Sequence, residues 1–339
     1  MEKNIDILFE RNEEQFNAFF QTMYERQLIW KRRFIDKKDA PWTNNSVFKK
    51  YKFTNVYREL DRNSQYCINR IIKPNAKAPL NNLVWKVLVF RLFNNPETFE
   101  CASKIWPCGI PDYDKYLNEK NEYAKFMEDL SKKSNIFTNA YFIWSTRANG
   151  YTRTDCYTKI VLPKLHTLIR QIIRVCENCA APYDIIRIFK EIPGVSNFVA
   201  FELYNDLLYI NKFINYNLVL FDSNKYVNVG PGSKMGLNLI YPNLKGTDNY
   251  KKAMHMLLDL AYGQLLKIGL NNSEPMPYAK YNPETESYFV TDKCNLTIGN
   301  IEHWLCEYSK YYRLANEANH KQRIFKPVSN NNLYSYEIL

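Results

Sequence analysis

Residues 183–203 read Y-D-I-I-R-I-F-K-E-I-P-G-V-S-N-F-V-A-F-E-L, and this stretch decides the expected fold. The spacing of its apolar residues predicts a short helix that ends at Lys190 and a second helix that begins after Ser196, the expected N-cap. Between them Gly194 permits the backbone angles of a tight turn. Two helices joined in this way form a helix-hairpin-helix, in which the amides of Gly194 and Ser196 can hold a DNA phosphate. The alternative is an ordinary turn between two packed helices.

Helical periodicity dominates the rest of the chain, which has only 10 glycines in 339 residues. Besides the hairpin, helices are expected over residues 8–36, 53–72, 80–93, 96–102, 113–131, 157–176, 250–267 and 298–315. Short strands are expected around Val219 and over 288–290, and residues 271–286 are expected to form a loop. The sequence therefore predicts a mainly α fold with two helical lobes and a cleft between them.

The chain carries a surplus of positive charge, with 46 Lys and Arg against 35 Asp and Glu and a formal net charge of +11. A surplus of this size favours an anionic partner, and the 26 tyrosines and 20 phenylalanines supply rings that stack on bases. We therefore expect a nucleic acid as the main partner, with binding that weakens as salt rises because phosphate contacts release counterions. Double-stranded DNA with a modified base is the form of it that the family resemblance described below implies. A soluble protein with a merely positive surface is the alternative.

The eight cysteines show no spacing typical of a metal site. Cys176 and Cys179 form a lone C-x-x-C and the four histidines are scattered, so we expect free thiols, no bound metal and no cofactor. The first residues, M-E-K-N, lack the apolar segment of a secretory leader, and no window approaches the ~18 apolar residues of a membrane span. The expected location is intracellular, in the cytoplasm or nucleus, or in the host cytoplasm if the protein is viral.

One face of the helix expected over residues 53–72 is polar and rich in arginine. Its members recur at helical spacing and are Asn55, Arg58, Asp61, Arg62 and Gln65. An Asn and a Gln within an Arg-rich stripe suit recognition of a base edge or a phosphate. A solvated face, with pairs three and four residues apart, is an equally good interpretation.

A glycine-rich segment covers residues 227–237. Gly230 and Gly232 flank Pro231 and precede Lys234, and a loop of this kind can bring backbone amides against a phosphate or a flipped nucleotide. A plain turn between helices is the alternative. The pattern G-x-x-x-x-G-K-[ST] occurs nowhere in the sequence, which disfavours nucleoside-triphosphate kinase activity by this chain.

The helix expected over residues 298–315 carries a last candidate pair. Its apolar stripe leaves Glu307 and Lys310 on the other side, three residues apart. These two side chains either belong to a site or simply pair with each other on a solvated face.

Five segments together resemble one family, which comprises the helical domain associated with hydroxymethyluracil DNA kinases and the α-glutamyl/putrescinyl-thymine pyrophosphorylases. They occur in the family's order and read F-T-N-V-Y-R-E-L-D-R-N-S-Q-Y (53–66), F-T-N-A-Y-F-I (137–143), I-P-G-V-S-N-F-V-A-F-E-L (192–203), V-G-P-G-S-K-M-G-L (229–237) and L-C-E-Y-S-K-Y-Y-R (305–313). The resemblance implies a helix-hairpin-helix fold like that of DNA glycosylases over residues 51–328. Residues 1–50 would then be an N-terminal helical extension and 329–339 a tail.

The resemblance also implies a chemistry. In the family's pathway a hydroxymethyluracil in DNA is first pyrophosphorylated, and a pyrophosphorylase-like protein then replaces the diphosphate with an amine on a flipped, hypermodified thymine. The catalytic candidates carried over are Asp61, Arg62, Glu307 and Lys310. The substrate-binding candidates are Asn55, Arg58, Gln65, Lys234 and Arg313, and the DNA-binding candidates are Gly194, Ser196, Gly230 and Gly232. Of these, Asp61 or Glu307 would deprotonate the amine, and the cations would hold the diphosphate.

Two other functions stay open on the sequence. In a DNA glycosylase that excises a modified base, Asp61, Glu307 or Asp222 would stabilise an oxocarbenium ion or activate water. A non-enzymatic reader of modified DNA would need no such group. A lyase is disfavoured because Asn197 and Phe198 stand where glycosylases with this hairpin often carry a Schiff-base lysine.

The chain departs from the family's pattern in the fifth segment. Ser309 stands where relatives usually have an aspartate before the Lys-Tyr pair, and His303 stands where an amide side chain is expected.

Overall fold

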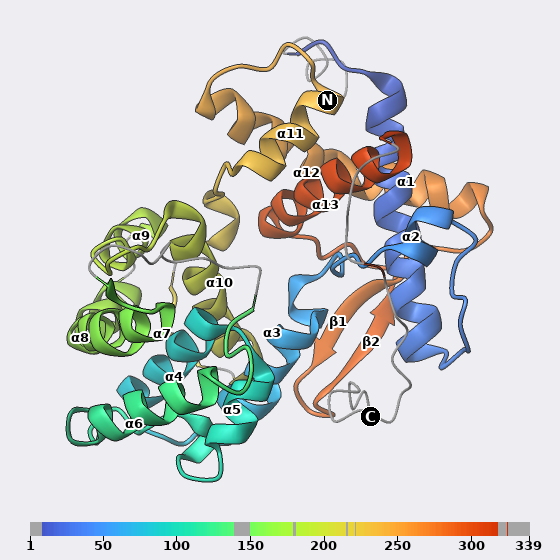
Figure 1. The fold of residues 1–339 in the computed structure, drawn as a ribbon. Helices are drawn as coiled ribbons and strands as arrows, with labels where there is room; N and C mark the ends of the chain where they lie inside the picture. The colour runs from blue at the N-terminus through green and yellow to red at the C-terminus, as the bar shows by residue number, and fades with distance from the viewer. Residues whose placement is uncertain are drawn as a thin grey trace. The chain divides into compact units, whose positions relative to one another are not determined.

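The computed structural model describes residues 9–138, 150–178, 181–214, 216–220, 222–317 and 324. The chain forms two compact units: the first contains the residues up to Asp61 and from Ser223 onward, and the second contains Arg62–Asp222 (Figure 1). The domain boundaries expected after residues 50 and 328 stay predictions. The tail expected over 329–339 lies outside the described residues.

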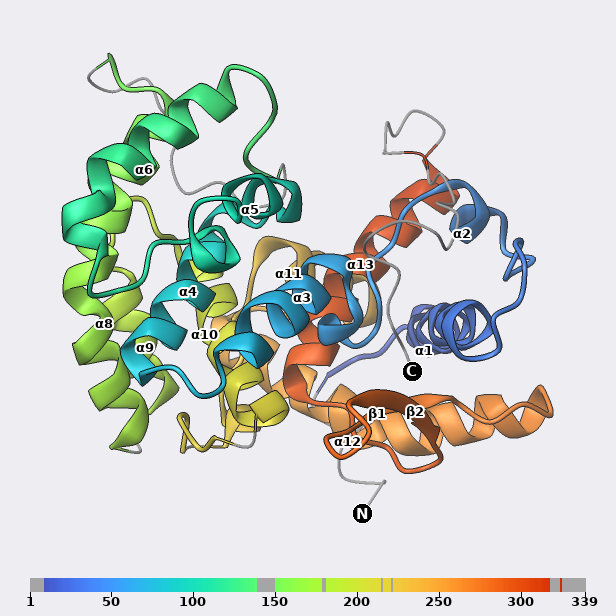
Figure 2. The same ribbon diagram turned by 90° about the horizontal axis from the view of Figure 1, so that it is seen from below.

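The first unit is helical apart from one hairpin of strands. Its elements are α1 (Glu13–Trp30), η2 (Lys31–Ile35), α2 (Ser46–Lys50), η3 (Arg58–Leu60), η9 (Ser223–Lys225), α11 (Pro231–Ile240), α12 (Thr247–Asn271), β1 (Tyr278–Asn282), β2 (Ser287–Thr291) and α13 (Ile298–Asn316). Helices α1, α11, α12 and α13 contact one another pairwise and enclose the core of this unit (Figure 2).

Helices α1 and α13 begin at caps that the sequence encodes. The side chain of Asn12 accepts a hydrogen bond from the backbone amide of Gln15, in the first turn of α1, at 3.1 Å. Thr297 and Asn300 form a capping box at the start of α13, so amides that a helix start leaves unpaired are satisfied at both helices. The buried faces of the two helices meet where Trp304 Nε1 donates to the carbonyl of Phe19 at 3.3 Å.

The strands β1 and β2 pair antiparallel, with Tyr278 opposite Thr291 and Asn282 opposite Ser287. The strand expected over 288–290 is confirmed as part of β2. Its partner β1 lies inside the segment expected to be a loop. Pro and polar residues in that segment disfavour a strand when the sequence is taken alone, and pairing with β2 stabilises β1. The expectation of a strand around Val219 is wrong, since the described residues 216–220 contain none.

The second unit is entirely helical in its described residues. Its elements are α3 (Arg62–Tyr66), η4 (Cys67–Ile72), η5 (Lys73–Asn75), α4 (Leu80–Phe93), α5 (Pro96–Ala102), η6 (Pro107–Gly109), α6 (Tyr116–Ser131), α7 (Arg153–Cys156), η8 (Tyr157–Val161), α8 (Leu162–Glu177), α9 (Pro182–Phe189) and α10 (Asn197–Ile214). Helix α4 is apolar nearly all round and contacts both α8 and α10. Within that core, Arg91 of α4 forms a bidentate ion pair with Asp206 of α10, at 2.5 and 2.7 Å. Apart from β1 and β2, the regular elements of both units are helices in the described residues, so the mainly α fold class is confirmed.

The hairpin region consists of α9, a turn and α10, as the sequence predicts. Gly194 has a φ of 80°, which other residues adopt only with strain. Ser196 Oγ accepts a hydrogen bond from the backbone amide of Val199 at 3.3 Å, so the predicted N-cap of α10 is confirmed. The binding of a DNA phosphate by these residues stays a prediction.

The seven cysteines that the structure describes are free thiols, and Cys179 lies outside the described residues. Within the described part of the chain, no three or more His, Cys, Asp or Glu side chains gather in a way that would hold a metal ion. None of the described helices has the length and apolar character that a membrane span needs.

Candidate functional site

Two segments far apart in the sequence meet in the first unit: the loop of residues 53–61 and helix α13. The backbone amide of Thr54 donates to Glu307 Oε2 at 3.1 Å, and Thr54 Oγ1 lies 2.8 Å from His303 Nε2. Residues 53–61 of the first segment that resembles the family therefore lie beside the fifth segment.

The loop is closed by side chains. Asp61 Oδ1 accepts from the backbone amide of Asn55 at 2.8 Å and from Asn55 Nδ2 at 3.2 Å, and Asn55 Nδ2 also donates to the carbonyl of Leu60 at 2.8 Å. Asn and Asp side chains that bind the backbone in this way compete with helix formation. The single helix expected over 53–72 is therefore wrong: residues 52–57 are irregular, η3 is one short turn, and α3 starts only after Asp61.

Helix α13 presents three polar side chains toward this loop. His303, Glu307 and Lys310 are spaced by four and then three residues, which places them on one face of the helix. The opposite side is apolar and buried, which fixes the rotation of α13 about its axis; it includes Ile301, Trp304, Leu305 and Tyr308. The polar face is partly accessible, with 20% of the His303 side chain, 13% of Glu307 and 17% of Lys310 exposed.

Glu307 is held in its charged form. Burial by itself disfavours the carboxylate, but Lys310 Nζ at 2.8 Å, the nearby imidazole of His303 and the amide of Thr54 outweigh it and keep the pKa of Glu307 below its usual range. Glu307 therefore stays ionised and ties the loop to Lys310.

Asp61 behaves in the opposite way. Burial raises the pKa of Asp61, and the charge of Glu307 adds to this, whereas His303, the amide of Asn55 and Arg26 of α1 only partly oppose it. Asp61 Oδ2 lies 3.9 Å from His303 Nε2. Two carboxylates whose pKa values are pushed in opposite directions around one imidazole are suited to different roles in acid–base chemistry.

An aromatic wall and a second cation border these groups. Lys310 Nζ lies 4.3 Å from the centre of the Phe53 ring, and Arg26 Nη2 donates to the carbonyl of Phe53 at 3.4 Å. The rings of Phe48 and Tyr311 both contact Phe53. We call the set of Arg26, Thr54, Asp61, His303, Glu307 and Lys310 the loop–helix cluster.

The structure brings together three of the four catalytic candidates, Asp61, Glu307 and Lys310, and their catalytic role stays a prediction. Asn55 and Arg58 also lie in the first unit but are buried, with 4% and 9% exposed. The donors of Asn55 are used to hold Asp61 in place.

Arg62 and Gln65 belong to α3 in the second unit. Arg62 forms an ion pair with Glu97, and Gln65 Oε1 accepts from Asn69 at 3.2 Å. The expectation that all five polar residues share one helix face is therefore wrong, because the helix is broken at Asp61.

The glycine-rich segment is not a loop beyond Gly230, because α11 begins at Pro231 with Gly230 as its N-cap residue. A Cβ on Gly232 would lie 2.9 Å from Cys306 Sγ, and one on Gly236 would lie 2.4 Å from the carbonyl oxygen of Leu305. These glycines let α11 approach α13 closely, which is a packing reason for them that the sequence did not reveal. Phosphate binding by Gly230 and Gly232 stays a prediction.

The two remaining substrate candidates make local contacts. Lys234 Nζ lies 5.6 Å from the centre of the Tyr250 ring, and Arg313 Nε donates to the carbonyl of Ser309 one turn earlier, at 3.4 Å.

Three members of the loop–helix cluster were not among the sequence-derived site residues: Arg26, Thr54 and His303. His303 had a usable signal, since it precedes Glu307 by four residues on a predicted helix. Arg26 and Thr54 had none, because only the tertiary fold brings them to α13.

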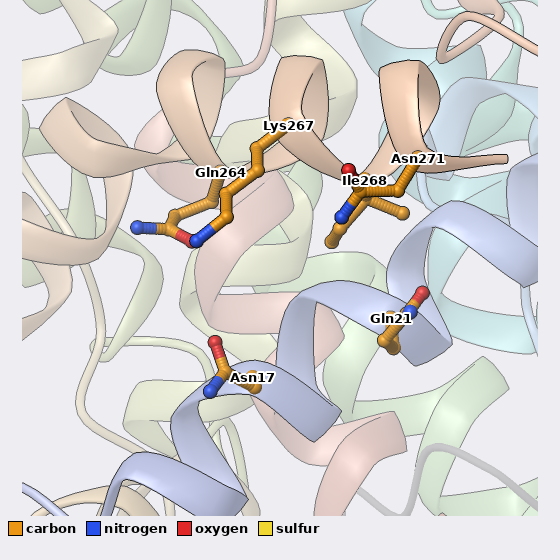
Figure 3. Close-up of a pocket in the computed structure, with 6 residues that line it drawn as sticks. All are labelled: Asn17, Gln21, Gln264, Lys267, Ile268 and Asn271. Atoms are coloured by element: carbon orange, nitrogen blue, oxygen red, sulfur yellow. The ribbon is translucent and has the colours of Figure 1, made fainter. Parts of the chain in front are cut away.

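Two pockets of the first unit are lined by residues outside the loop–helix cluster. One pocket lies between α1 and α12, and Figure 3 shows that mostly amide side chains and one lysine line it; they are Asn17, Gln21, Gln264, Lys267, Ile268 and Asn271. None of these residues belongs to the loop–helix cluster. A second pocket lies along α1 and the end of α13 and includes Tyr311 in its lining. In the second pocket, burial raises the pKa of Tyr308. The loop–helix cluster is the better candidate for a functional site, because two carboxylates with shifted pKa values converge there on an imidazole and a lysine.

Comparison with known proteins points in the same direction as the five segments. Residues 13–321 match the family described as the helical domain of 5-hmdU DNA kinase. The 5-hmdU DNA kinase of Bacillus phage SP10 is 27% identical over 308 residues, which cover 88% of this chain and 45% of the relative. The chain thus spans less than half the length of that relative, and no solved structure matches it significantly. The chain belongs to the family of 5-hmdU DNA kinase helical domains.

Proposed function

We propose that this chain acts on a modified thymine in DNA, where it displaces diphosphate from a diphosphorylated 5-hydroxymethyluracil and joins an amine to the same carbon. Membership of the family supports DNA and a hydroxymethylated base as the substrate class. The net charge of +11 supports an anionic partner.

The observation that carries the proposal is the loop–helix cluster itself. Diphosphate is already a good leaving group on this methylene carbon, so the protein has to place the amine, take up its proton and neutralise the charge that develops on the departing oxygen. Lys310 and Arg26 supply positive charge within the cluster. Asp61 and Glu307 have pKa values shifted in opposite directions beside the imidazole of His303, which provides groups of different acidity for the proton transfer.

Phosphoryl transfer fits the chain less well. The relative from Bacillus phage SP10 is named a kinase, but this chain matches only 45% of it. The sequence lacks a G-x-x-x-x-G-K-[ST] loop to cradle a nucleoside triphosphate. We therefore propose that the diphosphate is installed by another protein or domain, and that this chain consumes it.

Base excision is the second candidate, and the contacts that the carboxylates already make count against it. A carboxylate that stabilises an oxocarbenium ion has to face the sugar, whereas Asp61 accepts two hydrogen bonds from Asn55 through Oδ1 and faces His303 with Oδ2. Glu307 is charged but is already bound by Lys310 and the amide of Thr54.

The DNA would be bound as a duplex, with the target base flipped out of the stack. We propose that the hairpin amides of Gly194 and Ser196 hold a backbone phosphate, and that the N-terminal turn of α11, with Gly230 and Gly232, holds a second. Affinity should then fall steeply as salt rises.

The test is product identification on a synthetic duplex that carries one diphosphorylated 5-hydroxymethyluracil, incubated with the protein and putrescine. Mass spectrometry of the released nucleosides should find the putrescine adduct, and free diphosphate should appear in equal amount. A duplex with plain 5-hydroxymethyluracil serves as the control and should yield neither. Abasic sites without an adduct would show a glycosylase instead, and tight binding with unchanged DNA would show a reader.

A further inference from the structure

The imidazole of His303 lies at the centre of the loop–helix cluster. Its Nε2 is 2.8 Å from Thr54 Oγ1 and 3.9 Å from Asp61 Oδ2, whereas its Nδ1 makes no hydrogen bond to any residue that the structure describes. A carboxylate on the Nε2 side favours the tautomer whose proton is on Nε2, because that N–H points toward negative charge. The lone pair is then on Nδ1.

We propose that Nδ1 of His303 accepts the proton of the amine as the amine replaces diphosphate, with Asp61 on the far side of the ring stabilising the imidazolium. This inference rests on the proposed function and assigns the base within the same site. It follows the general logic in which a buried carboxylate orients an imidazole and the imidazole's other nitrogen moves the proton.

Neither carboxylate is as well placed as the imidazole to receive this proton directly. Glu307 Oε2 already accepts from the amide of Thr54 and from Lys310, and its pKa is lowered. Asp61 uses Oδ1 for two bonds from Asn55, and its other oxygen faces the ring. Thr54 and Asp61 approach the same ring nitrogen, so Thr54 orients the imidazole rather than being activated by it as a nucleophile.

The charged groups of the cluster are Asp61 from the loop, Glu307 and Lys310 from α13, and Arg26 from α1. The two carboxylates favour an imidazolium, and the two cations oppose it. In the step, a bond forms between the amine nitrogen and the methylene carbon, and the bond from that carbon to the diphosphate oxygen breaks. The electron pair leaves with diphosphate, and one proton passes from the nitrogen to His303 Nδ1. Two carboxylates near the ring offset its new charge.

A nucleophile that carries no proton distinguishes a role of His303 as a base from a structural role. Azide attacks the same carbon but has no proton to lose, so it needs no base. Putrescine and azide are therefore compared as nucleophiles on the diphosphorylated duplex, with wild type, His303→Gln and the matched control His255→Gln, a histidine of α12 outside the cluster. His303→Gln should slow formation of the putrescine adduct on the order of 10²-fold and leave the azide rate unchanged. His255→Gln should match wild type with both nucleophiles.

Equal loss with both nucleophiles would overturn the assignment, since it would show that His303 supports the fold or the leaving group. Unchanged rates with both would overturn it as well. Should His303→Gln fail to fold by thermal melting, Asp61→Asn gives the same test, because weakening the imidazolium should slow putrescine transfer and spare azide transfer. A wild type that forms neither adduct would overturn the proposed function, and this inference with it.

Discussion

Asp206 in the second unit and Asp61 in the first are both acidic side chains surrounded by helices, yet their surroundings differ in kind. Asp206 is fully buried and receives two hydrogen bonds from Arg91, which is itself only 3% exposed. Asp61 is 21% exposed, and its second oxygen lies 3.9 Å from an imidazole. A carboxylate closed off by a guanidinium holds helices together, whereas one that faces a titratable ring at a partly open surface can take part in proton transfer.

The largest effect is expected in the buried pair. Arg91→Met leaves the charge of Asp206 in the core without its guanidinium, so we expect the free energy of unfolding to fall by about 3–5 kcal/mol. Urea denaturation monitored by circular dichroism measures this. The double variant Arg91→Met/Asp206→Leu should regain most of the loss, because neither position then carries a buried charge. A loss below ~1 kcal/mol in the single variant, the range of an exposed pair, would show that the site is more open than its burial indicates.

A smaller effect is expected where α11 approaches α13. In Gly236→Ala the new Cβ would meet the carbonyl oxygen of Leu305 at 2.4 Å, so backbone has to shift and stability should fall by about 1–3 kcal/mol. Gly263 in α12 is the matched control, since a Cβ there meets nothing within 4 Å. Gly263→Ala should gain about 0.5–1 kcal/mol through helix propensity. Melting temperatures that move in the same direction for both variants would contradict the packing role of Gly236.

The two cluster carboxylates should respond oppositely to pH. The raised pKa of Asp61 means that its charge costs stability above the folded-state pKa, so Asp61→Asn should be at least as stable as wild type at neutral pH. The lowered pKa of Glu307 means that its charge adds stability, which is lost as pH falls through the folded-state pKa. Glu307→Gln should therefore be less stable at neutral pH, and its difference from wild type should vanish in acid. Melting curves over a pH series test both signs, and shifts in the same direction would refute the split.

The smallest effect on stability is expected for Arg62→Ala. Its ion pair with Glu97 is exposed, at 44% and 56%, and such pairs contribute about 0–1 kcal/mol. Thermal melting should barely change. Adduct formation by the same variant tests the separate expectation that Arg62 holds the diphosphate, which a full rate would contradict.

Long, strongly periodic helices could be predicted from the sequence. The apolar run of α4, expected over 80–93, has those bounds in the structure, and the turn at Gly194 with its cap at Ser196 was also foreseen. These features depend on residues close in sequence, where periodicity, capping and glycine conformation act directly.

The loop of residues 53–61 shows why the rest could not be predicted. Its apolar residues recur at helical spacing and are buried, so periodicity favours a helix. The hydrogen bonds from Asn55 to Asp61 replace the backbone bonds of a helix in this segment, and only the three-dimensional structure shows this. Asp61, Glu307 and Lys310 were chosen from the sequence, but the meeting of loop and helix joins residues about 250 positions apart in the chain, where neither spacing nor composition carries information.

We propose that the loop–helix cluster performs the replacement of diphosphate by an amine. The most direct measurement is the single-turnover rate of putrescine-adduct formation on the diphosphorylated duplex, for wild type, Glu307→Gln and the control Glu284→Gln at an exposed turn. Glu307→Gln should lose on the order of 10²-fold in rate, because Glu307 positions Lys310, the cation of the cluster, and binds the loop through Thr54. DNA affinity should stay unchanged, and the variant, although less stable, should remain folded under the assay conditions. Glu284→Gln should match wild type. A folded Glu307→Gln that forms the adduct as fast as wild type would contradict the account.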